Sequence, residues 1–139
     1  AYGLAGIGIE DTTGNPDAPI RDFDQAVERV RSAVNAAKRR IVVTARTDNY
    51  LQGRPDLDDT IRRLTAFAEV GADVVYAPFP PDLASLEAIV AAVAPTPVNV
   101  LISPADQVLT VAELQAAGVK RISLGPALYT NAMTALGTK

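Results

Sequence analysis

Short apolar runs alternate with longer stretches in which apolar residues recur at helical spacing. The runs at residues 41–45 and 98–103 are rich in valine and isoleucine, which is typical of strands buried on both faces. The alternation repeats five times, so it predicts five strands, each followed by a helix. The first predicted helix carries its apolar face at Phe23, Ala26, Val27, Val30, Ala33, Val34 and Ala37.

Capping and turn residues set the limits of these elements. Asp22 or Asp24 can begin the first helix, Asp58 or Asp59 the second, and Asp82 the third. A capping box with its hydroxyl at residue 110 begins the fourth helix, and glycines at 71 and 118 end the second and fourth. We therefore expect strands at residues 5–11, 41–45, 72–77, 98–103 and 119–124, and helices at residues 22–38, 58–70, 83–93, 110–117 and 127–136.

Strands that alternate with amphipathic helices indicate right-handed crossovers and a parallel sheet. Two α/β architectures fit this pattern. One is a doubly wound open sheet of five strands, and the other is an incomplete (β/α)8 barrel. Both handle ligands at the carboxyl ends of the strands, and hydrophobic periodicity does not choose between them.

Charged residues stand where two of the predicted strands end. Arg46 and Asp48 follow the run at residues 41–45, and Glu10 and Asp11 end the first strand. Arg46 is the first candidate for a substrate-binding residue, because strand ends carry ligand sites in parallel α/β folds. The simpler interpretation is a solvated strand exit with no chemical role.

Composition narrows the possible chemistry. The chain has 139 residues, a net charge of −3, and neither cysteine nor histidine. Thiolate and imidazole chemistry is therefore excluded. Any catalysis or ligand binding must depend on carboxylates, arginine, hydroxyls, amides or a hard cation. The only basic run is residues 38–40 and aromatic residues are few, which argues against nucleic-acid binding. We find no membrane-spanning run and no signal peptide, so we expect a cytoplasmic protein with no membrane partner.

Six motifs occur in a characteristic order along the whole chain: GIGIED, TARTD, GRPDLDDTIRR, GAD, PVNV and GVKRISLG. They stand at residues 6–11, 44–48, 53–63, 71–73, 97–100 and 118–125. In this order and spacing the chain resembles the isocitrate lyase/phosphoenolpyruvate mutase superfamily. The resemblance implies a partial TIM barrel, with residues 1–139 as a single domain that carries strands four to eight and lacks the first three.

The same resemblance implies a magnesium site and roles for particular residues. Mg²⁺ prefers oxygen ligands and keeps several waters, so a strand-end carboxylate can anchor it through water. The primary aspartate ligands of the superfamily belong to the third strand and are expected upstream of this chain. The implied roles are Glu10 as the water-mediated metal anchor and a catalytic residue, Asp11 as a secondary metal candidate, Arg46 as the residue that stabilises an enolate, Asn99, Ser123 and Gly125 as substrate-binding residues, and Thr12 or Thr13 as substrate-positioning residues on a mobile gating loop.

The chain departs from the lyases of this superfamily in the loop that follows the first strand. Those lyases carry a Lys-Lys-Cys-Gly-His type segment with a catalytic cysteine, whereas residues 12–22 contain no Lys, Cys or His. The predicted strand at residues 72–77 also lacks the acid that often follows it. Cleavage of isocitrate or methylisocitrate is therefore not expected.

These observations predict a Mg²⁺-dependent enzyme of the lyase/mutase type, or a fragment of one, that acts on a small α-keto acid or related carboxylate. The reaction would break or form a C–C or P–C bond through an enolate-like intermediate. One alternative is an inert barrel fragment stabilised by association, since open sheet edges invite pairing and a homo-oligomer is expected. Another is an open-sheet phosphoacceptor domain that uses Asp48 or Asp11.

Overall fold

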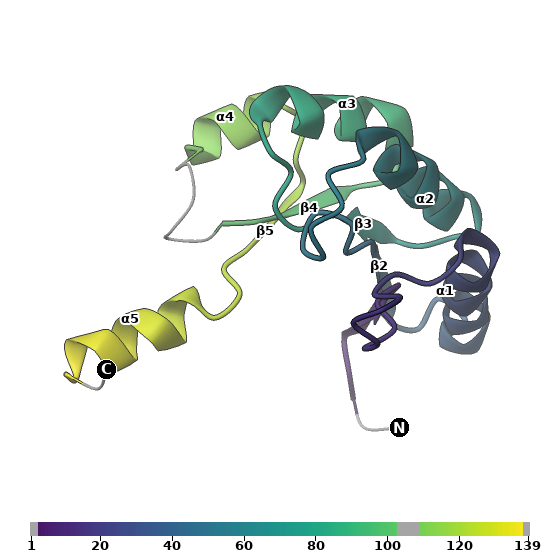
Figure 1. Ribbon diagram of the computed structural model, residues 1–139, viewed down its shortest axis with the longest axis horizontal. Coiled ribbons are helices and arrows are strands. Elements are labelled where there is room, and N and C mark those ends of the chain that lie inside the picture. Colours follow the sequence, from purple (N-terminus) through teal and green to yellow (C-terminus); the bar gives the residue numbers. More distant parts are fainter. Residues whose placement is uncertain (1–2, 103–108, 138–139) are drawn as a thin grey trace.

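The computed structural model describes residues 3–102 and 109–137. These residues form five parallel strands that alternate with five helices. Figure 1 shows the strands as a curved sheet with helices along its outer side. The elements are β1 (Gly6–Glu10), α1 (Phe23–Ala37), β2 (Val42–Arg46), α2 (Leu57–Glu69), β3 (Val74–Tyr76), α3 (Leu83–Val93), β4 (Val98–Leu101), α4 (Val111–Ala116), β5 (Arg121–Ser123) and α5 (Ala127–Ala135).

The strand order decides between the two architectures. The five strands lie side by side in sequence order, β1-β2-β3-β4-β5, and each pair of neighbours is parallel. A doubly wound sheet reverses its strand order at a switch point, and this sheet has no reversal. The fold is therefore a segment of a (β/α)8 barrel, and an open-sheet phosphoacceptor domain is excluded because it needs the other topology.

The hydrophobic core fills the space between the sheet and helices α1 to α4. Alternation along β2 places Val43 and Ala45 on the helix side, where they are almost fully buried, and Thr44 and Arg46 on the opposite, concave face. Phe67 from α2 is completely buried at the centre of the core. The core thus covers one face of the sheet and leaves the concave face to polar residues.

Side-chain caps are formed at the starts of α2, α3 and α4, whereas Asp22 stands at the N-cap position of α1 without a side-chain capping hydrogen bond. Asp82 accepts a hydrogen bond from the Ser85 amide at 2.7 Å, and the capping box at the start of α4 is formed. The second helix, however, begins earlier than predicted, because Asp56 rather than Asp58 or Asp59 caps it by accepting from the Asp59 amide. Three aspartates within four residues offered competing caps. The fourth strand ends before the predicted limit, and its last predicted residue, 103, lies outside the described residues.

The last helix stands apart from the others. Figure 1 shows α5 extending away from the curved layer formed by α1 to α4. Leu128 and Tyr129 are 68% and 69% exposed, and of the residues in α5 only Ala127 is buried. The described part of this helix therefore contributes little to the core. Among the described residues, no helix combines the length and apolarity needed to cross a bilayer.

Candidate active site

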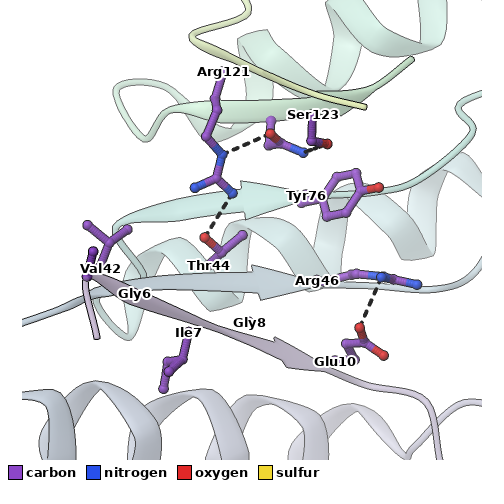
Figure 2. A pocket seen from close by; sticks show the side chains of 12 residues that line it. Gly6, Ile7, Gly8, Glu10, Val42, Thr44, Arg46, Tyr76, Arg121 and Ser123 are labelled. Atoms are coloured by element: carbon purple, nitrogen blue, oxygen red, sulfur yellow. Dashed lines mark hydrogen bonds and ion pairs between the residues drawn. The ribbon is translucent and has the colours of Figure 1, made fainter. Parts of the chain in front are cut away.

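One row of residues crosses the concave face from the first strand to the last. Glu10 pairs in register with Arg46, Arg46 with Tyr76, Tyr76 with Asn99, and Asn99 with Arg121. All five line a single cavity of about 520 Å³ (Figure 2). Because neighbours in register lie on the same face of a sheet, the row gathers two cations, one carboxylate, an amide and a phenol in one place.

Arg46 is the most heavily engaged residue of this row. Its Nη1 lies 3.0 Å from a carboxylate oxygen of Glu10, and its Nε donates to Oδ1 of Asp48. The guanidinium also lies over the Tyr76 ring, 5.5 Å from the ring centroid. Two carboxylates and an aromatic face thus fix the orientation of Arg46.

Burial shifts the protonation of two groups around Arg46. Burial raises the pKa of Asp48, and the hydrogen bond and positive charge of Arg46 only partly counteract it. Burial likewise raises the pKa of Tyr76, against the opposing effects of Arg46 and Ser123. Tyr76 therefore stays a neutral hydroxyl at physiological pH, next to the Ser123 side chain.

Asn99 and Arg121, at one end of the row, form a hydrogen-bonded set with Ser123. Arg121 donates through Nε to Oδ1 of Asn99 at 2.9 Å and through Nη2 to the Thr44 hydroxyl at 2.9 Å. Asn99 in turn donates through Nδ2 to the Ser123 hydroxyl at 3.0 Å. Asn99 is 2% exposed, so its amide is held within the protein and is satisfied on both sides.

The first strand leaves room in front of this polar surface. Gly6 and Gly8 share a face with Glu10 and line the cavity. A Cβ built on Gly8 would meet no atom within 4 Å, so Gly8 borders open space next to its register neighbour Thr44. The cavity is therefore open on the side of β1, opposite Arg121 (Figure 2).

Asp11 occupies a different environment from Glu10, although the two are adjacent in sequence. It is 2% exposed, and its carboxylate accepts from the Asp48 amide, the Thr47 hydroxyl and the Arg63 guanidinium. Each oxygen of Asp11 therefore has at least one protein donor. Because both of its oxygens already accept hydrogen bonds from the protein, Asp11 is better suited to a structural role than to metal binding.

The two threonine hydroxyls of the loop after β1 form hydrogen bonds within the loop. The Thr12 hydroxyl donates to the carbonyl of Pro19, and the Thr13 hydroxyl donates to the carbonyl of Ala18 at 2.6 Å. Neither threonine lines the cavity in this arrangement, and neither does Gly125, which follows β5 with a φ of +50°. Of the predicted site residues, the structure brings together Glu10, Arg46, Asn99 and Ser123, and places Thr12, Thr13, Gly125 and Asp11 elsewhere.

Sequence reasoning missed Tyr76 and Arg121. Tyr76 is not a charged residue at a strand end, and Arg121 begins its strand rather than ending it, so neither matches the pattern of charged strand ends. The only signal that finds both is the strand register, in which they are neighbours of Asn99. A staggered sheet places the start of one strand beside the end of another.

The described residues do not by themselves form a complete metal site. Across residues 3–102 and 109–137, no three acidic side chains lie close enough together to hold a metal ion. Glu10 is the accessible carboxylate of the row, with a side chain that is 45% exposed. A single carboxylate at a cavity mouth fits a water-mediated contact to Mg²⁺, and further oxygen ligands are needed to hold the ion.

The profile of the phosphoenolpyruvate phosphomutase family matches residues 1–139. The chain belongs to this family. A protein of Mycobacterium tuberculosis (strain H37Rv), Rv1998c, is 34% identical over 131 residues, which cover 91% of this chain and 46% of that protein. This phosphomutase-family chain therefore spans about half the length of the curated relatives it matches.

Solved structures of the superfamily share the fold. A Burkholderia cenocepacia J2315 protein classed provisionally as a lyase/mutase is 47% identical with a TM-score of 0.92, over 96% of this chain and 49% of that one. Phosphonopyruvate hydrolase, solved with oxalate and Mg²⁺, is 25% identical with a TM-score of 0.80, over 97% and 49% of the two chains. The phosphomutase-family chain thus matches lyase, mutase and hydrolase relatives, and it corresponds to about half of each structure.

Proposed function

We propose that this chain forms the substrate-binding half of a Mg²⁺-dependent enzyme that acts on a small α-keto acid or a related carboxylate. The reaction breaks or forms a C–C or P–C bond through an enolate-like intermediate. The observation that carries the proposal is the row Glu10, Arg46, Tyr76 and Asn99 along one cavity wall. Family membership and the Mg²⁺–oxalate complex of a relative support the reaction class.

Arg46 has the properties that stabilisation of an enolate requires. Its guanidinium is charged at every working pH, and its contacts to Glu10 and Asp48 hold it in place before a substrate arrives. A preorganised cation costs no reorganisation when negative charge develops on an enolate oxygen. The neutral hydroxyl of Tyr76 and the amide of Asn99 add donors for the carboxylate of the same substrate.

Glu10 is assigned to the magnesium ion. Mg²⁺ would supply a Lewis acid that polarises the carbonyl and carboxylate oxygens of the substrate. Glu10 contacts Arg46 through one oxygen and has a partly exposed carboxylate, which suits a hydrogen bond to a metal-bound water. We propose that the primary ligands come from aspartates outside these residues.

The test is an assay of the full-length protein that contains residues 1–139. Oxaloacetate, phosphonopyruvate and 2-methylisocitrate are tested with Mg²⁺ and with an excess of chelator. We expect turnover of one of the first two substrates, its loss on chelation, and a loss in kcat/KM of about 100-fold or more in Arg46→Ala. The control is Arg31→Ala, since Arg31 is an exposed residue of α1 that pairs with Glu28 on the same helix.

The assignment fails if turnover is unchanged by the chelator or by Arg46→Ala. The 139-residue chain is assayed beside the full-length protein, and we expect it to be inactive because it supplies one carboxylate for the metal. Activity of the short chain at the level of the full-length protein would contradict the incomplete metal site.

We also propose that the chain associates with further copies of itself. The sheet has open edges at β1 and β5, and α5 exposes apolar side chains such as Leu128 and Tyr129. Light scattering should report an oligomer that the double variant Leu128→Ser, Tyr129→Ser weakens. A monodisperse monomer at micromolar concentration would exclude association.

A further inference from the structure

We propose that Arg121 is a positioning residue that sets the orientation of the Asn99 amide, so that the Nδ2 group of Asn99 faces Ser123 on the cavity wall. The inference rests on the proposed function for its consequence in catalysis. The orientation itself rests on the contacts of Arg121, Asn99 and Ser123, and it holds whatever the reaction is.

The first step is the donor character of arginine. A guanidinium has five N–H donors and no acceptor, so a side-chain amide beside it must turn its oxygen toward it. Arg121 Nε lies 2.9 Å from Asn99 Oδ1, in accordance with this rule. The reversed amide would place its NH₂ group against a donor and leave a buried group unsatisfied. Arg121 therefore leaves Asn99 one acceptable orientation.

The second step is what this orientation does on the other side of the amide. With Oδ1 committed to Arg121, Nδ2 must face Ser123, to whose hydroxyl it donates at 3.0 Å. The Ser123 hydroxyl has its own proton directed to the carbonyl of Val100 at 3.2 Å. Hydrogen-bond polarity thus runs in one direction, from Arg121 through Asn99 to Ser123.

A second hydrogen bond holds the Arg121 side chain in place. Its Nη2 donates to the hydroxyl of Thr44, which lies on β2, two strands away from β4. Figure 2 shows the guanidinium of Arg121 directed toward Thr44, and its Nε also contacts Asn99 Oδ1. Among the described residues, no carboxylate pairs with Arg121, so its two contacts are both to neutral oxygens. In the described part of the chain, no ion pair therefore competes with the hydrogen bond from Arg121 to Asn99.

The consequence concerns the ligand group that this part of the cavity accepts. Nδ2 of Asn99 has a second hydrogen beyond the one that Ser123 receives, and Arg46 is a cation in the same row. Arg46, Arg121 and Nδ2 of Asn99 are donors, and Glu10 is an acceptor at the β1 end of the row. The donor part of the row favours a ligand group that only accepts hydrogen bonds, such as a carboxylate or a phosphonate. An ammonium group at the same place would face donors and positive charge.

The orientation is tested by NMR on the isotope-labelled 139-residue protein. In the wild type we expect the stronger nuclear Overhauser contacts of the Asn99 side-chain NH₂ to be with the Ser123 β-protons and the weaker ones with the Arg121 side chain. In Arg121→Glu, which replaces a donor by an acceptor, the stronger contacts should move from Ser123 to the side chain at position 121. A wild-type spectrum with the stronger contacts on Arg121 would overturn the proposal even if no variant folds, and an unmoved pattern in folded Arg121→Glu would overturn it as well.

The catalytic consequence is tested on the full-length protein with the substrate found in the panel. Arg121→Met should lower kcat/KM on the order of tenfold, with most of the change in KM, and Arg121→Lys should recover most of the loss because it keeps a donor. Equal losses in both variants, or a loss in kcat alone, would contradict positioning through Asn99. If no substrate of the panel turns over, the proposed function fails while the spectra still decide the orientation. If a substrate is turned over but the spectra contradict the proposed Asn99 orientation, the proposed role of Arg121 is wrong and the proposed function is unaffected.

Discussion

Asp11 and Arg63 form a buried ion pair of 3.3 Å although 52 positions separate them in the chain. Their side chains are 1% and 6% exposed. Arg63 also donates to the carbonyl of Arg21 at 2.9 Å, and the amide of Arg21 donates to the carbonyl of Asp11 at 2.9 Å. One guanidinium from α2 therefore holds both ends of the loop that follows β1, next to the strand end that carries Glu10.

Removal of this guanidinium should be costly. Arg63→Met leaves the Asp11 carboxylate buried without its charge partner, and we expect the free energy of unfolding to fall by about 3–5 kcal/mol in urea denaturation. The matched control is the neighbouring Arg62→Met. Arg62 is 60% exposed and packs over the Phe23 ring at 3.8 Å, so its loss should cost less than about 1 kcal/mol. An equal fall in the free energy of unfolding in the two variants would show that the Asp11–Arg63 pair contributes no more to stability than the exposed Arg62.

Asp59 should make stability depend on pH in the acid range. Burial opposes its ionisation, but hydrogen bonds from Arg63 and Asn49 together with the nearby positive charge lower its pKa below 3.8. The folded protein therefore binds this proton more weakly than the unfolded chain. The stabilisation is present above pH 3.8 and is lost as pH falls through the lower pKa of the folded state.

The variant that tests this linkage is Asp59→Asn. At pH 7 it should lower the free energy of unfolding by about 1–3 kcal/mol, because Arg63 loses a charged acceptor. The difference from the wild type should narrow in urea titrations carried out at successively lower pH below 3.8. Asp58→Asn, at an exposed neighbouring position, is the control and should show little difference at any pH. A deficit that stays constant down to the lowest pH would mean that ionisation of Asp59 is not the cause.

Gly6 and Gly8 should respond oppositely to a methyl group. A Cβ on Gly6 would lie 2.9 Å from the Val42 carbonyl oxygen, whereas a Cβ on Gly8 would meet open space. We expect Gly6→Ala to lower the free energy of unfolding by about 1–3 kcal/mol through overpacking, and Gly8→Ala to leave it unchanged or raise it by about 0.5 kcal/mol. Thermal unfolding of the two variants side by side decides this, and a destabilised Gly8→Ala would contradict the open cavity beside β1.

Glu10 should affect the metal more than the protein fold. In the full-length enzyme, Glu10→Gln should raise the Mg²⁺ concentration for half-maximal activity by about 10–100-fold, because an outer-shell anchor loses its charge. Glu87→Gln, on the exposed side of α3, should not change it. The measurement is a magnesium titration of initial rates at saturating substrate. A titration midpoint equal to that of the wild type would remove Glu10 from the metal site.

Local sequence signals predicted the elements well because their causes are local. The cap of α3 at Asp82 and the capping box at Thr110 depend on residues three positions apart, and both formed as predicted. The start of α2 was predicted too late because the competition among Asp56, Asp58 and Asp59 is settled by where the chain enters the helix. The sequence of these few residues does not determine which aspartate takes the N-cap position.

The site was predicted only in part for a related reason. Glu10 and Arg46 both end strands, so their proximity followed from a parallel sheet without knowledge of the register. Arg121 begins its strand, and its contact with Asn99 depends on the stagger between β4 and β5. Stagger is set by how the strands pack against the helices and against one another, and no short sequence pattern encodes it.

The sequence by itself determined the alternation of strands and helices, the charged strand ends and the family motifs, because periodicity, caps and motifs are properties of neighbouring residues. The tertiary structure decided the sequential strand order, the row from Glu10 to Arg121, and the burial of Asp11 against Arg63 while its neighbour Glu10 faces the cavity. These features join residues from different strands and helices. They are fixed by long-range packing and by the need to satisfy buried charges, which act only once the chain has folded.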